Sequence, residues 1–293
     1  MKQVIIVLLF ILLSVTSYAQ YFYYNEKYYD NDLLLEGGLS VGLMNAATDV
    51  GKRSGSIISP GYYDWGCSNL SMGLYFGAMY KSLFGARLEF TRGVVGGMDS
   101  RSNTPYVVFR NLSYKSSIFE ATLTGQFYPL ALLNKEELPA LSPYVLAGFG
   151  LFSYFPKAMY DSQWVSLRSL HTEGQNSVEF PKRKEYGEKA WCFPMGFGIK
   201  YDYSAKINFR FEGIYRLTTT DYLDDVSTTY VDPSILMTSQ RILLAHRYRE
   251  LLPTKDLTGR TRGSPGTNDR YFSFTIKVGY LLGRNKIPVN DVP

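Results

Sequence analysis

Two histidines, His171 and His246, are the first residues to consider in a search for chemistry along this 293-residue chain. Nucleophilic catalysis needs a histidine beside a hydroxyl and a carboxylate. His171 has Ser169 and Glu173 close by in the sequence. Serine and glutamate are common in any long polar loop, however, and both histidines lie in such loops. We therefore expect exposed loop histidines and a protein that is not an enzyme.

Four carboxylates, Asp221, Asp224, Asp225 and Asp232, form a second candidate group. Calcium prefers oxygen ligands, but these residues do not match the twelve-residue calcium loop. Aspartate, serine and threonine also form turns and helix caps, and that is the role we favour. Neither zinc-ligand spacing nor a nucleotide-binding glycine loop occurs in the right context. We expect no metal, no cofactor and no small-molecule substrate.

Cys67 and Cys192 are the only two cysteines. An oxidising compartment would allow them to pair. Each is expected at the outer end of a strand, on opposite sides of the fold inferred below. A disulfide needs Cα atoms within about 7 Å, so this geometry disfavours a bridge.

The elements that must position these residues are strands, because apolar and polar residues alternate in stretches of about ten. In residues 271–283, Phe272 and Phe274 share one face while Ser273 and Lys277 share the other. A tilted strand of about this length crosses a bilayer. Eight segments carry the pattern: 33–44, 69–80, 84–92, 118–128, 142–155, 191–203, 207–217 and 271–283.

The polarity of the two faces separates a membrane barrel from a soluble sandwich or lipocalin-like barrel. Charged residues cannot lie in a dry core without partners, whereas the lumen of an eight-stranded barrel is just wide enough for side chains. We therefore predict that the apolar face meets lipid and that the lumen holds the charges, which are Arg87, Glu89, Glu120, Lys200, Arg210, Glu212, Arg216 and Lys277.

The connections alternate strictly between long and short. The long ones cover 45–68, 93–114, 156–189 and 218–270, and the short ones 81–83, 129–141 and 203–206. Outer-membrane barrels have short periplasmic turns and longer outer loops. The sequence thus predicts an all-β fold, an eight-stranded antiparallel transmembrane β-barrel of the outer membrane over residues 33–283. A short helix is expected in the last outer loop, after Asp232-Pro233-Ser234.

The two ends of the chain are assigned to the periplasmic side. Residues 1–19 have the pattern of a secretory signal peptide, with Lys2, an apolar run and small residues at Ser17 and Ala19. Residues 20–32 are an aromatic periplasmic segment, and residues 284–293 a periplasmic tail. Loss of Lys2 leaves 30 basic against 26 acidic residues, spread along the chain. This spread of charge excludes a nucleic-acid partner, which needs a dense basic face. The partner that we expect around the barrel is outer-membrane lipid.

Three parts of the sequence resemble a known family. They are YLDDVSTTYVD at 222–232, PKAMYDSQWVSL at 156–167 with HTEGQ at 171–175, and GFGIKYDYSAKINFRFEGIYR at 196–216. The chain resembles the PorG family, outer-membrane barrel components of the type IX secretion system of Bacteroidota. The resemblance implies an eight-stranded barrel associated with the periplasmic ring of PorK and PorN. It carries no catalytic residues.

If the resemblance holds, the ring should contact the periplasmic surfaces of the barrel. These are the N-terminal segment, the turn LLNKEELPALS at 132–142 and the tail RNKIPVNDVP at 284–293. A stand-alone barrel of the small OmpA-like kind, acting in adhesion or membrane stabilisation, is the alternative. A lipid-modifying barrel enzyme is the least favoured class.

Overall fold

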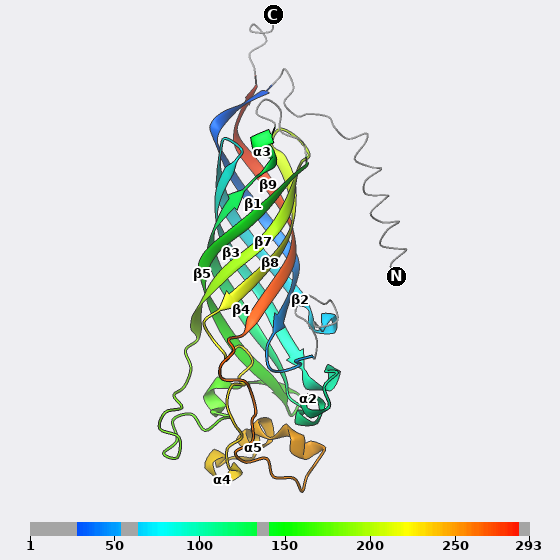
Figure 1. Cartoon of the computed structure of the whole chain (residues 1–293), viewed down its shortest axis with the longest axis vertical. Coiled ribbons are helices and arrows are strands. Elements are labelled where there is room, and N and C mark those ends of the chain that lie inside the picture. The colour runs from blue at the N-terminus through cyan, green and yellow to red at the C-terminus, as the bar shows by residue number, and fades with distance from the viewer. Residues whose placement is uncertain (1–27, 54–63, 134–140, 287–293) are drawn as a thin grey trace, which may run out of the picture.

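The computed structural model describes residues 28–53, 64–133 and 141–286, and these form a closed antiparallel β-barrel (Figure 1). Each barrel strand pairs with the next, and β1 pairs with β9 from Tyr28–Lys286 to Ala47–Arg270, which closes the ring. The predicted fold is confirmed. The strands are β1 (Tyr28–Ala47), β2 (Asn69–Tyr80), β3 (Phe84–Met98), β4 (Ser113–Phe127), β5 (Leu141–Tyr160), β7 (Lys189–Asp202), β8 (Ile207–Thr218) and β9 (Arg270–Lys286).

Several strands are longer than their alternation predicts. β1 begins at Tyr28 rather than at residue 33, and β9 ends at Lys286 rather than at 283. β5 continues to Tyr160 and returns as a short strand, β6 (Gln163–Ser166), which pairs with β5 alone. From the sequence we expected a loop here. Strand pairing outside the membrane needs no apolar face, so it leaves no periodic pattern in the sequence.

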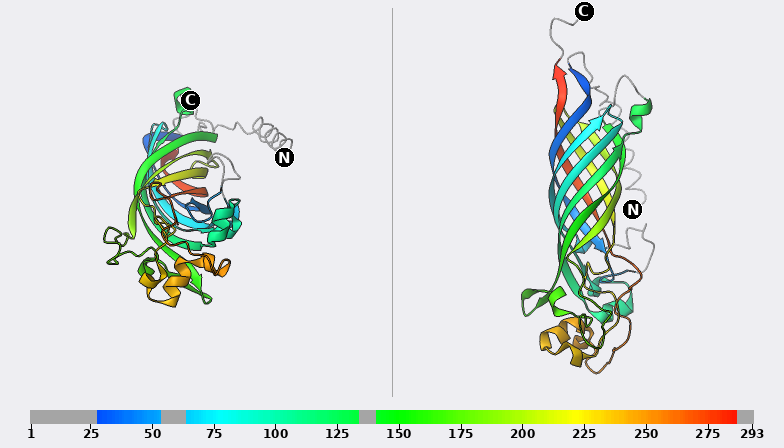
Figure 2. Two further views of the ribbon diagram at one scale, coloured as in Figure 1. Left: turned by 60° about the horizontal axis from the view of Figure 1, so that its bottom comes forward. Right: turned by 90° about the vertical axis from the view of Figure 1, so that its left-hand side faces the viewer.

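Long and short connections lie at opposite ends of the barrel, as their alternation predicts (Figures 1 and 2). The end with the short turns carries α3 (Leu130–Leu133). The other end, taken below as the outer end, carries η2 (Trp65–Cys67), η3 (Asp99–Arg101), α2 (Pro105–Arg110), η4 (Arg168–Leu170), α4 (Pro233–Leu236), α5 (Ser239–Ala245) and η5 (Arg247–Glu250).

The last outer connection contains the helix expected after Asp232, but it is divided into two short pieces, α4 and α5. The Asp232 carboxylate accepts the main-chain N–H of Ser234 at 2.9 Å and so caps α4. Met237 then adopts φ +62°, which a helix cannot continue through, and α5 starts again after Thr238. No helix among the described residues is long and apolar enough to cross a membrane.

The two faces of the barrel wall have the polarity that lipid requires. On the exterior, Leu39, Phe76 and Phe197 are 69%, 59% and 62% exposed. On the lumen side, Arg87 and Lys277 are at most 2% exposed. A water-soluble protein buries apolar rather than charged side chains. Because this wall does the reverse, its exterior is suited to face hydrocarbon.

Candidate functional site: the ion-paired lumen and the outer cap

The middle of the lumen is crossed by one network of charges. Arg87 of β3 donates two hydrogen bonds to Glu212 of β8, at 2.5 and 2.9 Å. Lys277 of β9 lies 3.2 Å from Glu212 and bonds to Glu89 as well. The Tyr144 hydroxyl also donates to Glu212. Each of these buried charges has a hydrogen bond or an ion pair to another member of the network in place of water. Charged groups can be buried only with such partners.

A further ion pair lies on each side of this network. Toward the short turns, Arg210 Nε donates to Glu36 Oε1 at 3.0 Å. Toward the outer end, Arg216 Nε lies 2.6 Å from Glu120 Oε2, which also accepts the Tyr271 hydroxyl. Every lumen charge named in the sequence analysis is buried on the inner face, so that prediction is confirmed.

Glycines make room for the rings that fill the lumen. A β-carbon on Gly38 would lie 2.6 Å from the ring of Tyr75. A β-carbon on Gly198 would lie 2.6 Å from the ring of Tyr144. Larger residues at these two positions would collide with the tyrosines. The lumen is therefore packed with side chains at several levels.

The outer end of the barrel is covered by its own connections, here called the outer cap (residues 48–53, 99–112, 161–188 and 219–269). Many of its apolar residues join one cluster with those of the barrel wall. Val50, Leu223 and Leu244 from the cap lie in that cluster with Val95 and Phe152 from the strands. The cap is therefore packed onto the barrel by a shared core.

Two buried arginines tie the connections of the cap together. Arg110 donates twice to the carboxylate of Asp99, at 2.7 Å each, and once each to the main-chain carbonyls of Asp49 and Arg262 at 2.6 Å. Arg262 in turn donates to Glu173 at 2.8 Å. The sequence did not reveal these arginines, because a loop has no periodicity.

Glu173 joins two of the segments that carry the family resemblance. It accepts the main-chain N–H groups of Ser227 at 2.9 Å and of Thr228 at 3.0 Å, and the Thr228 hydroxyl at 2.6 Å. Asp225 makes a second link, because it accepts the hydroxyls of Thr172 at 2.5 Å and Tyr186 at 2.7 Å. HTEGQ and YLDDVSTTYVD are thus bonded to each other in the cap.

Of the four carboxylates singled out in the sequence, only Asp232 is a helix cap. The other three are buried in the cap, and burial raises the pKa of Asp221 to about 7, of Asp224 to about 8 and of Asp225 to about 6. The neighbouring carboxylate of Asp49 raises that of Asp224 further. Among the described residues, no group of histidine, cysteine and carboxylate side chains is arranged to hold a metal ion.

The histidines are not assembled into a catalytic group. His171 Nε2 lies 2.7 Å from Glu185, whereas the Ser169 hydroxyl donates to the carbonyl of Ser166. The prediction that both histidines are exposed is wrong for His246, which is 1% exposed. It stacks on Tyr230, and burial lowers its pKa to about 4, so it is neutral at physiological pH.

Both cysteines are free thiols, as the strand positions predicted. Cys67 lies in η2 and Cys192 on the lumen side of β7. Other sequence predictions fall outside the described residues. These are the signal peptide at 1–19, the segment 20–27, most of the turn at 132–142 and the tail from 287 onward.

No protein-family model matches this chain, and no curated protein is similar to it in sequence. Solved structures with a similar outline include the outer membrane protein OprG from Pseudomonas aeruginosa, with 14% identity over 88% of this chain and 98% of that one, and a TM-score of 0.39. Neisserial surface protein A has 8% identity over 86% and 98%, with a TM-score of 0.37. Ail of Yersinia pestis, solved with a heparin analogue, has 11% identity over 85% and 99%, with a TM-score of 0.36. These values are too low to assign a function. The strand pairing itself gives the fold class, an eight-stranded barrel of the outer-membrane type.

Proposed function

We propose that this chain is a non-enzymatic outer-membrane barrel subunit of a type IX protein secretion machine. It would reach the outer membrane through its signal peptide and associate there with a periplasmic ring of PorK- and PorN-like proteins. The observation that supports this most is the lumen, which ion pairs and tyrosine rings cross at several levels. A barrel packed in this way is suited to be a rigid anchor rather than a conduit.

The position of the resembling segments also favours the proposal. Segments 171–175 and 222–232 meet at Glu173, and segment 156–167 includes the hairpin of β5 and β6. The resemblance therefore falls on residues that build the outer cap, and not on lipid-facing positions alone. In the proposed machine the cap faces outward, and the ends of the chain and the short turns face the ring.

An in-frame deletion of the gene tests the secretion role. Export of cargo bearing the C-terminal signal domain should fail in the deletion strain and return when the full chain is supplied. Normal export in that strain would contradict the proposed secretion role. A chain whose residues 21–27, which precede β1, are replaced by a Gly/Ser segment of equal length tests docking separately, since it should insert normally but recover less ring protein. Crosslinking from Lys135 in intact cells would identify the partner.

A stand-alone barrel that acts through its outer loops is the second candidate. Exposed apolar side chains at the outer end favour it, in particular Val178 at 92% and Met237 at 84% exposed. In this case the deletion strain would export cargo normally but lose adhesion or envelope integrity.

A further inference from the structure

Four cations point outward from neighbouring strands at the outer rim of the barrel. They are Arg92 on β3, Lys115 on β4, Lys157 on β5 and Lys189 on β7, and all four are exposed. Lys115 lies directly opposite Lys157 in the ladder. Arg92 and Lys189 share one level of the ladder through Phe119 and Ser153, whereas Lys115 and Lys157 lie four residues nearer the outer end. With strands about 4.8 Å apart and about 3.4 Å per residue, the four positions lie within roughly 17 Å of one another. Like charges opposite each other destabilise a sheet, so this cluster has a cost that an anion would remove.

No carboxylate in the described part of the chain forms an ion pair with these four cations. The nearby acid Glu188 is paired with Arg168 at 3.0 Å. Aromatic rings support two of the cations instead, since Arg92 lies 5.1 Å from the ring centre of Phe119 and Lys115 lies 5.2 Å from that of Trp164. Their charges are therefore left available at the boundary between lipid and water.

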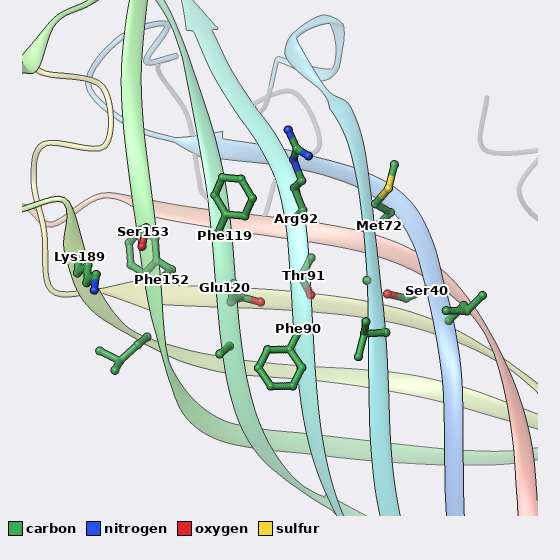
Figure 3. Close-up of a pocket in the computed structure, with 15 residues that line it drawn as sticks. Ser40, Met72, Phe90, Thr91, Arg92, Phe119, Glu120, Phe152, Ser153 and Lys189 are labelled. Atoms are coloured by element: carbon green, nitrogen blue, oxygen red, sulfur yellow. The ribbon is translucent and has the colours of Figure 1, made fainter.

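An open apolar depression adjoins the cluster on the lipid-facing side (Figure 3). Its volume is about 770 Å³, within the range of roughly 300–1,000 Å³ that small-molecule sites occupy. Ala121 leaves space between Phe90 and Leu151, its partners in the two adjacent ladders. Figure 3 shows Arg92 and Lys189 on either side of Phe119, at the edge of the depression.

The opposite side of the outer rim has a different character. There Trp65 packs against Phe272 and Phe274, with ring centres 5.8 and 5.9 Å apart. Leu43 and Leu70 continue this apolar surface on β1 and β2. A general attraction to the headgroup region would place cations all round the barrel. One cation, Arg270, also lies at the outer end of β9 on that side. The four on β3, β4, β5 and β7, next to a depression, are therefore a concentration of charge and indicate a local site.

We propose that this surface binds a phosphorylated, multiply acylated lipid of the outer leaflet. The phosphate would lie among the four cations, because arginine and lysine pair with phosphate oxygens. The acyl chains would fill the depression over Ala121. The inference requires that the cap faces outward, but it does not depend on the secretion role, so failure of one leaves the other standing.

Native mass spectrometry of the full chain in non-ionic detergent tests the proposal, with diphosphoryl lipid A and its dephosphorylated form as probes. The wild type should retain the phosphorylated lipid preferentially. The double variant Arg92→Gln/Lys189→Gln should weaken that binding by about tenfold or more. The matched control is Lys81→Gln/Lys206→Gln, two exposed cations at the other end of the barrel, which should bind like the wild type.

Two further measurements make the test independent of one variant. Ala121→Phe fills the depression without changing charge, so it should weaken binding of the acylated lipid while heat-dependent gel mobility shows an intact barrel. Millimolar inorganic phosphate should not displace the lipid. Equal retention of both lipid forms, displacement by free phosphate, or equal loss in the control variant would overturn the proposal.

Discussion

The lumen and the outer cap both bury charged side chains, but they balance them differently. Among the described residues the lumen buries five carboxylates and five cations, whereas the cap buries seven carboxylates and only two cations, Arg110 and Arg262. Asp202 pairs with Lys200 of its own strand, and the other four lumen carboxylates meet cations from other strands. Several cap carboxylates are held mainly by main-chain N–H groups and hydroxyls. The ion pairs therefore make the barrel rigid, whereas the stability of the cap depends on the protonation of its carboxylates.

The largest effect is expected from unbalancing the lumen. Glu212→Gln leaves Arg87 and Lys277 with Glu89 as their only carboxylate, and removal of one member of a buried ion pair costs about 3–5 kcal/mol. The urea midpoint for unfolding in phospholipid vesicles should fall accordingly. Thr122→Val, a buried lumen residue outside the ion pairs, is the control and should change the midpoint little. Equal midpoints for both variants would contradict the role of the network.

A smaller and local effect is expected from Arg262→Met, which leaves Glu173 and Asp225 without their cation. The free energy needed to open the cap should fall by about 3 kcal/mol, while the strands stay paired. Limited proteolysis should then cut residues 219–269 at least tenfold faster, with an unchanged urea midpoint for the barrel. Arg260→Met, at an exposed position, should leave the cleavage rate as it was. Loss of the barrel along with the cap would show that the two are not separable.

The stability of the cap should fall as pH rises. Asp221, Asp224 and Asp225 have pKa values raised to about 7, 8 and 6, so they bind protons more tightly in the folded cap than when exposed. Their contribution is complete below about pH 4, the ordinary aspartate value, and is lost as pH rises through about 6 to 8. Amide exchange in residues 221–227, corrected for its intrinsic pH dependence, should be about tenfold faster at pH 8.5 than at pH 5.5. Exchange that slows with rising pH would contradict this sign.

The smallest effect is expected from Asp221→Asn. An amide carries no charge to bury, so the cap should be stabilised, and by about 1 kcal/mol more at pH 8 than at pH 5. The pH dependence of exchange should become shallower by the same amount. Asp232→Asn, at the exposed start of α4, serves as the control and should leave the pH dependence unchanged. A loss of stability at pH 8 would show that the Asp221 charge is needed.

The barrel could be predicted from the sequence because each strand has two environments. Phe272 and Lys277 lie on opposite faces because side chains alternate along a strand. Apolar side chains are stable against lipid, and charged side chains are stable in the lumen. The alternation of apolar and polar residues stops where a strand leaves the membrane. Continuation of β5 to Tyr160, the return strand β6 and the first residues of β1 are held by ladder hydrogen bonds, which any sequence can make.

The cap could not be predicted because its contacts join residues far apart in the chain. His246 and Asp224 look like ordinary polar loop residues in the sequence, yet each is at most 1% exposed. Asp224 accepts the main-chain N–H of Val50 from the first outer connection, and His246 packs on the ring of Tyr230. The break at Met237 could not be predicted either, since the apolar spacing of residues 235–248 would suit one continuous helix.

The ion pairs of the lumen also have a consequence for assembly. Strands β1–β4 contribute Glu36, Glu89 and Glu120 against Arg87, a formal charge of −2 on their inner face. Strands β5–β9 contribute four cations against Asp202 and Glu212, a formal charge of +2. Each half of the ring is therefore electrostatically incomplete, and a slip of one residue along a strand would turn its charges toward lipid. Insertion into the membrane should accordingly be cooperative, with half-barrels too unfavourable to accumulate and the seam between β1 and β9 closing on two surfaces that attract each other.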